Sequence, residues 1–539
     1  MRMLGAVVAL VLLAVAPASA ATVSSDAWFK ASDGVELMTT VTGEAPLTAR
    51  PTIVEFSPYG DNSSTFNAGA AYNHLLVQIR GTGDSHGSFD ALGPRTQADV
   101  AEALDWACHQ KFSDGRLALN GFSASAITIY NSLHLKLQCV RAAILKSGTF
   151  ELYRDLLVPG GVSNLVPGAG VMALIGAPAL AQGGGRDPAT AADAITGLFG
   201  AGLTELQHPT LDDWWRERGF RGDVNHLPVL VVNGFFDVEA PGAVQGYPRL
   251  RRDGAHHVVV GAHDGAPANT DAGYGEMVAW ADRYVRGIAS GVAKHPRAQL
   301  WLSDGDRELT LQNQYVRYDA ANWPVPNTRW RTLWLDGKKL VRRRPKTSAE
   351  QSYPAAPTFP FNTDPPNAGI VGAMGFNALT QGFAPLGDMT LAEPFGLSYT
   401  TAPLTRDLLS AGPAALTVTL ASTAPETPIW VVLSDVWPDG TAHPLTAGRL
   451  LSSFPRIDRR RSLIRRGRVV QPLNRFGKKE PDAKARRYHV ELWPVGNRFK
   501  KGHSVRLHIV GASAASPVAI PGVNTVTTGG SKLLLPVLP

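Results

Sequence analysis

Apolar runs that read as buried strands alternate with amphipathic helical stretches from Pro51 to about residue 292, and no other feature constrains the fold as much. Runs such as AAIL, PVLVV and HVVVG lack the polar alternation of a half-exposed strand, so both faces of their sheet must be covered. Between such runs, TQADVAEALDWACHQ and YGEMVAWADRYVRGI carry apolar residues at helical spacing. The alternation predicts a mostly parallel sheet with helices on both faces.

The second half of the chain has a different pattern of predicted secondary structure. After about Ala293, short strand-like runs such as AALTVTLAS, PIWVVLSDV and SVRLHIVGA are separated by turn signals, and long amphipathic helices are absent from the sequence pattern. A single hydrophobic core rarely grows beyond about 250–300 residues, so a chain of 539 residues needs more than one domain. We therefore predict an all-β sandwich or jelly roll after the α/β domain.

One stretch interrupts the α/β alternation. Residues 150–219 are rich in Gly, Ala, Leu and Pro, include helical pieces such as ATAADAITGLFG, and lie between two core strands. We interpret them as a helical insertion that caps one end of the sheet. The expected organisation is a signal peptide (1–20), an α/β domain in two parts (21–149 and 220–292), a helical cap insertion (150–219) and a β jelly-roll domain (293–539).

The N-terminus has the three parts of a secretory signal: Arg2, an apolar run from Leu4 to Ala16, and the small residues Ala18-Ser19-Ala20. We predict cleavage after Ala20. The alternative is an uncleaved anchor, but the apolar run is short for a membrane span of about 20 residues. No later segment offers such a span, so we expect a secreted or periplasmic (cell-envelope) protein with no stable membrane span after cleavage.

The formal net charge of +7 arises largely from a basic segment between Arg456 and Arg487, which includes RIDRRR, LIRRGR and KKEPDAKARR. Such a run can bind nucleic acid or an anionic surface. Because no nucleic-acid motif or row of aromatic residues accompanies it, we expect a solvated loop and no nucleic-acid partner. The sequence assigns this segment no role.

Only two cysteines occur, Cys108 and Cys139. They fall near the ends of two helices that flank one predicted strand, and an exported chain meets oxidising conditions, so we expect a disulfide between them. The alternative is a pair of buried free thiols. Neither CxxC nor HExxH is present, so we expect neither a metal nor another cofactor.

A strand, a sharp turn and a helix meet at Gly121-Phe122-Ser123-Ala124-Ser125. This is close to G-x-S-x-G, the elbow that exposes the nucleophile of α/β-hydrolases, with Ser at its last position. The partners of such a serine follow in the order acid, then histidine, each after a core strand. Asp237 in NGFFD and His263 in VVVGAH satisfy that order, so we predict Ser123, Asp237 and His263 as a catalytic triad.

Other interpretations of these positions stay open at this point. Ser123 could merely cap a helix, with the aspartate in a turn and the histidine in a loop. Ser125 lies one step into the helix and is expected to face the core, and Glu239 is two residues further from its strand than the aspartate. His256 and His257 stand at the start of their strand, and Asp264 is expected only to steady the histidine loop.

Several motifs together resemble the cocaine esterase (CocE/NonD) and X-Pro dipeptidyl-peptidase family of serine hydrolases. IRGTGDSHGSF, SPYG, NGFFD, GAH and WADRYVRGI are similar to its core segments, and LSDVWPDGTAHPLTAG and VELWPVGNRFKKGHSVRLHI to its C-terminal domain. The resemblance implies an α/β-hydrolase core with a helical cap insertion and a C-terminal jelly roll. It also implies an oxyanion hole made by the Tyr59 phenol and the Ala124 N–H. Where the family has an aromatic residue and a glycine after the nucleophile, this chain has Ala124 and Ala126, which puts the family's substrates in doubt.

The sequence thus predicts an exported esterase or amidase that acts through an acyl-enzyme on a small ester, an amide or a short peptide. Alternatives within the enzyme class are an X-Pro dipeptidyl-peptidase and an α-amino acid ester or β-lactam acylase. An exopeptidase needs carboxylates for the free amino terminus, and the cap has Glu205, Asp212, Asp213 and Glu217 without a dedicated pair. A non-catalytic binding protein is the alternative from a different class. The natural substrate and the oligomeric state stay open.

Overall fold

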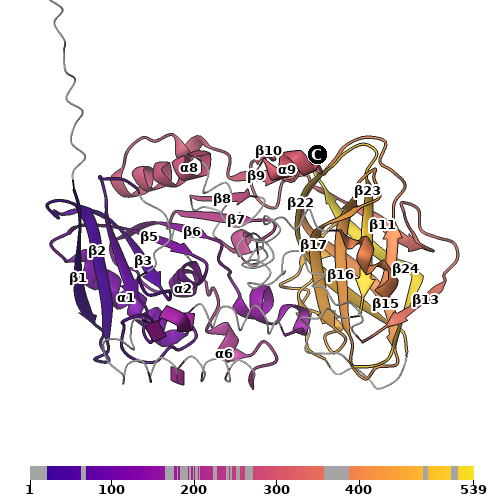
Figure 1. The fold of residues 1–539 in the computed structure, drawn as a ribbon, viewed down its shortest axis with the longest axis horizontal. Coiled ribbons are helices and arrows are strands. Elements are labelled where there is room, and N and C mark those ends of the chain that lie inside the picture. The colour runs from indigo at the N-terminus through magenta and orange to yellow at the C-terminus, as the bar shows by residue number, and fades with distance from the viewer. Residues whose placement is uncertain are drawn as a thin grey trace, which may run out of the picture.

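The computed structural model describes two large β-sheets that lie side by side along the long axis of the molecule (Figure 1). The residues described are 21–61, 68–163, 207–222, 227–237, 246–250, 255–261, 271–312, 314–356, 388–477, 484–511 and 520–539, with short pieces between 175 and 244. The predicted signal peptide, 1–20, lies outside them, as does much of the predicted cap. In the described part of the chain, no helix has both the length and the apolar character that crossing a membrane requires.

The first sheet is the predicted parallel sheet. Its strand order is β1-β2-β4-β3-β5-β6-β7-β8-β9-β10, and all pairs from β4 to β9 are parallel. The remaining pairs, at the two ends of the sheet, are antiparallel. The strands are β1 (Thr22–Lys30), β2 (Glu36–Glu44), β3 (Arg50–Ser57), β4 (Asn73–Gln78), β5 (Ser113–Phe122), β6 (Val140–Lys146), β7 (Val229–Gly234), β8 (His256–Gly261), β9 (Ala298–Leu302) and β10 (Val316–Ala320).

Strands β9 and β10 lie beyond the boundary expected at residue 293, yet they extend the first sheet. β9 pairs in parallel with β8, from Val258 opposite Ala298 to Val260 opposite Leu300, and β10 pairs antiparallel with β9. The first sheet therefore includes two strands that follow the expected boundary. A short strand without a following helix has the same pattern of apolar residues as a jelly-roll strand. The sequence pattern alone therefore assigned β9 to the wrong sheet.

Helices cover both faces of the first sheet, as the alternation predicts. Val100 and Leu104 of α1 and Ile127 of α2 belong to the buried cluster on one face, while Trp280 of α8 belongs to the cluster on the other. The helices are α1 (Pro94–Cys108), α2 (Ala124–Ser132), α6 (Asp213–Arg216), α8 (Asp271–Ala281) and α9 (Arg307–Leu311); shorter helical segments are η1 (Tyr153–Leu157), η2 (Pro159–Gly161), η4 (Tyr247–Arg249), η5 (Asp282–Arg286), η6 (Val292–Lys294) and η9 (Met389–Phe395).

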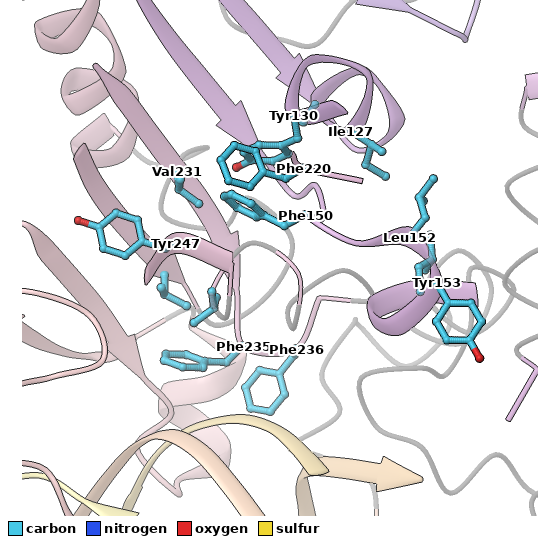
Figure 2. Close-up of a cluster of buried hydrophobic side chains, with 14 of the residues drawn as sticks. Ile127, Tyr130, Phe150, Leu152, Tyr153, Phe220, Val231, Phe235, Phe236 and Tyr247 are labelled. Atoms are coloured by element: carbon cyan, nitrogen blue, oxygen red, sulfur yellow. The ribbon is translucent and has the colours of Figure 1, made fainter. Parts of the chain in front are cut away.

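An aromatic cluster joins α2 to the segments that follow β6 and precede β7. Figure 2 shows Tyr130 of α2 close to Phe150 and Phe220, and the ring centroids of Phe150 lie 4.3 Å from Tyr130 and 5.0 Å from Phe220. Each buried aromatic ring of this kind removes about 150–250 Å² from water. The cluster therefore fixes both ends of the insertion against α2, the helix that follows Ser123.

The second sheet forms the C-terminal jelly roll, so the predicted fold class is confirmed in both halves of the chain. Its described strands run in the order β17-β16-β23-β14-β12-β11-β24-β15-β22, with β13 against β24. They are β11 (Arg329–Asp336), β12 (Lys339–Val341), β13 (Glu350–Pro354), β14 (Gly396–Thr400), β15 (Leu408–Ser422), β16 (Pro428–Val436), β17 (Ala442–Leu451), β22 (Arg486–Phe499), β23 (Ser504–Val510) and β24 (Val523–Val537).

The basic segment is more ordered than the predicted solvated loop. It forms two small antiparallel ribbons, and Arg475 pairs with Asp458 within the segment. Arg461 reaches across to Glu151 of the α/β half. The ribbons pair β18 (Arg456–Ile457) with β21 (Asn474–Arg475) and β19 (Leu463–Arg465) with β20 (Arg468–Gln471). Residues 478–483 of the segment lie outside the described residues.

The expected disulfide between Cys108 and Cys139 is present, with the two Cα atoms 6.1 Å apart. Cys108 ends α1, as expected. Cys139 lies past the end of α2 and directly before β6, where it has a φ of +60°. The bond therefore ties α1 to the strand next to β5, the strand that leads into Ser123.

Candidate active site

The turn at Ser123 has the strained geometry of a nucleophile elbow. Ser123 follows β5, precedes α2, and has φ +54° and ψ −125°. A non-glycine residue in such a conformation costs about 1–3 kcal/mol, which the surrounding structure must offset. A Cβ atom at Gly121 would lie 2.7 Å from the backbone of Ala126, so only glycine lets the helix approach the strand this closely.

Ala126 stands where the family has glycine, and Gly148 leaves room for its methyl group. A Cβ atom at Gly148, which follows β6, would lie 2.7 Å from the Cβ of Ala126. The methyl group that the chain adds on α2 thus occupies the space that a side chain after β6 would need. The departure from the family pattern leaves the packing behind the elbow intact.

The Tyr59 phenol lies between the Ser123 hydroxyl and the backbone N–H of Ala124. Tyr59 Oη lies 3.2 Å from Ser123 Oγ and donates to it, and Ala124 N–H donates to the same phenol oxygen at 3.2 Å. Tyr59 comes from the loop after β3, and Ala124 is the first residue of α2. A phenol O–H beside the serine hydroxyl and a backbone N–H at the start of the helix are donors of the kind that hold an oxyanion.

A second loop, which sequence reasoning treated only as a family motif, positions Tyr59. Gln78 at the end of β4 donates to Asp61 Oδ1 at 2.7 Å and accepts from Asp84 N–H at 2.6 Å. Gly83 in that loop has a φ of +56°, and a Cβ there would lie 2.7 Å from the Cα of Gly60. The close pair of glycines packs the two loops together beside Tyr59. The two glycines of IRGTG, separated by one residue, were the sequence signal that could have predicted the close packing of these loops.

Asp237 lies three residues beyond β7 and is buried, with 3% of its surface exposed. β7 and β8 are parallel and end level with each other, with Gly234 opposite Gly261. His263 follows Gly261 by two residues but lies outside the described residues, so its side chain is not placed. The sheet order nevertheless brings the ends of β5, β7 and β8 to one edge, with only β6 between β5 and β7.

The alternatives considered for the nucleophile and the base lie elsewhere. Ser125 is only 1% exposed, in the first turn of α2, so a substrate cannot reach it. His256 and His257 begin β8 at the opposite end of that strand from its C-terminal loop, and His257 Nδ1 lies 3.7 Å from Glu276. Glu239 and Asp264 lie outside the described residues.

A charged network lies between the segment after β6 and the jelly roll, with Asp155 buried and Arg154 and Glu491 half-buried. Arg154 of η1 forms two contacts with Glu491 of β22, at 2.5 and 3.2 Å. Asp155 beside it accepts from Thr149 Oγ1 at 2.7 Å and from Glu151 N–H at 3.1 Å. Burial raises the pKa of Asp155 to about 7, although the positive charge of Arg154 acts in the opposite direction.

The jelly roll also contacts the loop that carries Asp237. A Cβ atom at Gly496 of β22 would overlap the ring of Phe235, which is fully buried and precedes Asp237 by two residues. Gly496 also accepts a hydrogen bond at 3.1 Å from Ser303 N–H, just after β9. Within the described ranges, no group of three or more His, Cys, Asp or Glu side chains could hold a metal ion.

Comparison with known proteins identifies the family. The model of the X-Pro dipeptidyl-peptidase (S15 family) matches residues 33–264, and that of the X-Pro dipeptidyl-peptidase C-terminal non-catalytic domain matches residues 290–533. The chain is 22% identical over 488 residues to a cocaine esterase from Rhodococcus sp. (strain MB1 Bresler), which covers 81% of this chain and 80% of the relative.

Two solved structures share the fold over nearly the whole chain. A CocE/NonD family hydrolase from Staphylococcus aureus has a TM-score of 0.77 and 16% identity, covering 96% of this chain and 94% of that chain. An α-amino acid ester hydrolase has a TM-score of 0.72 and 16% identity, covering 98% of both chains. The chain therefore belongs to the CocE/NonD and X-Pro dipeptidyl-peptidase family of serine hydrolases, within the α/β-hydrolase superfamily.

Proposed function

We propose that the protein is an exported acyl esterase or amidase in which Ser123, His263 and Asp237 form the catalytic triad and Tyr59 and Ala124 form the oxyanion hole. The observation that carries the proposal is the Tyr59 phenol, which donates to the Ser123 hydroxyl and accepts from the Ala124 N–H. A serine that only caps a helix needs no phenol at its oxygen. The strained φ of Ser123 is a second support, because such strain clusters at functional sites.

In this mechanism, Ser123 Oγ attacks the carbonyl carbon of the ester or amide while His263 takes the hydroxyl proton. The carbonyl oxygen becomes an oxyanion and accepts hydrogen bonds from Tyr59 O–H and Ala124 N–H. The tetrahedral intermediate collapses, the alcohol or amine leaves with the proton from His263, and the acyl group remains on Ser123. Water, deprotonated by His263, then attacks the acyl-enzyme and releases the carboxylic acid. Asp237 fixes the tautomer of His263 and stabilises its cation.

Labelling with a fluorophosphonate probe tests the proposal, because the probe reacts with an activated serine. We expect the wild-type protein and Ser125→Ala to be labelled and Ser123→Ala not to be. A p-nitrophenyl ester panel, run beside X-Pro anilides and an amino-acid ester, then assigns the substrate class. A wild-type protein that neither reacts with the probe nor hydrolyses any of these substrates would be the non-catalytic binding protein.

An aminopeptidase-like activity on X-Pro substrates or α-amino acid esters needs carboxylates that are available to a free amino group. In the cap, Asp212 caps α6 by accepting from Trp215 N–H and also contacts His208, while Asp213 pairs with Arg216 at 2.6 Å. These carboxylates are therefore used within the cap itself. Glu205 lies outside the described residues. Asp212 and Asp213 are therefore not available to a free amino group, which supports simple esters or amides as substrates.

We also propose that residues 1–20 are a signal peptide removed after Ala20, and that residues 150–219 cap the hydrolase core. The Cys108–Cys139 bond supports export, because structural disulfides persist mainly in oxidising compartments. N-terminal sequencing of protein recovered outside the cytoplasm tests the cleavage site. A mature chain that still begins at Met1 would contradict this assignment.

A further inference from the structure

A cavity of about 450 Å³ opens in the jelly roll between β11, β12 and the chain that links β14 to β15. This volume is within the range of about 300–1,000 Å³ that is typical of small-molecule sites. Arg331 of β11 lies opposite Leu535 of β24, near the C-terminal end of the chain. The residues that line the cavity are Arg331, Leu333, Lys339, Leu340, Val341, Arg342, Thr401, Ala402, Pro403, Leu404, Thr405, Arg406, Asp407, Leu408, Val505 and Leu535.

Four cations line this cavity: Arg331, Lys339, Arg342 and Arg406. Among the residues that the structure describes, none of the four has an ion pair or a side-chain hydrogen bond. The acid of the cavity, Asp407, does not neutralise them, because its carboxylate is held by Arg498 at 2.7 Å and by Lys501 N–H at 2.8 Å. The cavity therefore has an uncompensated positive charge.

Arg331 distinguishes this cluster from a solvated basic surface. Its side chain is half-buried, whereas Lys339, Arg342 and Arg406 are exposed around it. Burial lowers the pKa of Arg331, and the charges of Arg342 and Arg406 lower it further. An arginine that is removed from water on folding usually lies beside a carboxylate. A half-buried arginine among like charges therefore indicates that its counter-charge comes from outside the chain.

The walls of the cavity are apolar below the cations. Leu333, Leu340, Val505 and Leu535 are buried beneath it, and Leu404 is half-buried at its side. Planar guanidinium groups bind the paired oxygens of carboxylates and phosphates through two parallel hydrogen bonds. A ligand that matches both features has an acidic head group and a short apolar body.

We propose that this cavity binds a small amphiphilic anion, whose carboxylate or phosphate head contacts Arg331, Arg342 and Arg406 and whose apolar part lies against Leu404 and Leu340. The site is in the domain that carries none of the proposed catalytic residues, so it is independent of the proposed hydrolase function. The head group could belong to a free organic acid or to a lipid in a bilayer, and we assign the free molecule, because the cavity has the volume of a small-molecule site.

Calorimetric titration of the full-length mature protein tests the site. The probes are octyl phosphate and octanoate below their micelle concentrations, inorganic phosphate, octyl glucoside, and vesicles that contain phosphatidylglycerol. We expect one saturable site for the two octyl anions, binding of inorganic phosphate at least about tenfold weaker, and no binding of octyl glucoside. Affinity for the octyl anions should fall with added salt, because the contact is between charges. Binding to vesicles without binding of the free anions would overturn the proposal in favour of a membrane surface.

A pair of matched variants separates this site from general charge effects. Arg331→Gln/Arg342→Gln/Arg406→Gln should weaken the binding of octyl phosphate by at least about tenfold. Arg459→Gln/Arg460→Gln/Arg465→Gln removes the same net charge from the exposed basic segment and should bind like the wild-type protein. Equal losses in both variants, or no loss in the first, would overturn the proposal. Arg406→Gln alone, at an exposed position, replaces the triple variant if that variant does not keep the wild-type melting temperature.

Discussion

Replacing Tyr59 with phenylalanine tests the proposed oxyanion hole most directly. The change keeps the half-buried ring and deletes only the hydroxyl that lies 3.2 Å from both Ser123 Oγ and Ala124 N. After the change, one of the two proposed donors remains, the N–H of Ala124. The phenol donates to an oxygen that gains charge only as the serine attacks, so its loss should raise the barrier without weakening substrate binding.

The expected magnitude follows from the number of donors lost. Loss of one oxyanion donor costs about 2.7–4 kcal/mol, so kcat should fall by about 10²–10³ while KM changes little. In the free enzyme the phenol also accepts from Ala124 N–H, a neutral hydrogen bond whose net worth is about 0.5–1.5 kcal/mol and that water can replace. The melting temperature should therefore stay unchanged.

The assay is steady-state hydrolysis of a p-nitrophenyl ester, with active enzyme counted by fluorophosphonate titration. Tyr72→Phe is the matched control, because it removes a phenol that donates to Asp282 at 2.8 Å in the same half of the chain. The control should retain the wild-type kcat. An increase in KM with unchanged kcat in Tyr59→Phe would refute the reasoning: Tyr59 would then be a wall of the substrate site, and the oxyanion donors would be backbone amides alone.

Three further predictions concern the nucleophile, the disulfide and a buried acid. Ser123→Ala should lower kcat by about 10⁴–10⁶ with the fold intact. If Ser123→Ala retains wild-type turnover and Ser125→Ala loses it, the assignment of Ser123 as the nucleophile is wrong. Intact mass after alkylation without reductant should show no added groups on Cys108 and Cys139, and replacing both by serine should cost about 3–4 kcal/mol in urea unfolding; two added groups would mean free thiols in solution. Burial raises the pKa of Asp155 from 3.8 to about 7, so its favourable contribution is complete below about pH 4 and is lost as pH rises to about 7. Over that range the unfolding free energy of the wild type should fall relative to that of Asp155→Asn by up to about 1.4 kcal/mol per pH unit, and a difference that does not change with pH would contradict this.

The sequence predicted those parts of the fold in which burial leaves a repeating pattern. Continuous apolar runs such as VLVV in β7 are buried on both faces, and that property alone identifies a parallel sheet between two layers of helices. The elbow was predictable for a similar reason, since a glycine two residues before Ser123 is required by the close approach of Ala126. The positions of Asp237 and His263 followed from a rule of chain order rather than from any pattern of their own.

Pattern could not assign strands whose partners are distant in the sequence. β9 and β10 look like jelly-roll strands, and only pairing with β8 shows that they extend the first sheet. The prediction that the basic segment is a solvated loop was wrong for the same reason. Its charge predicts solvation, but the partner that holds Arg461 is Glu151, which is 310 residues away along the chain. Local composition carries no information about such a partner.

Contacts between the two halves place the jelly roll, which carries none of the proposed catalytic residues, against the loop of Asp237. The half-buried pair of Arg154 and Glu491 holds the segment after β6 against β22. On the same strand, the backbone of Gly496 packs against Phe235, which leads into the loop of Asp237. The proposed role of Asp237, which is to orient the imidazole of His263, needs a geometry held to within about 0.5 Å and therefore a rigid loop. In this chain part of that rigidity comes from the jelly roll, because no side chain at position 496 would leave room for the Phe235 ring.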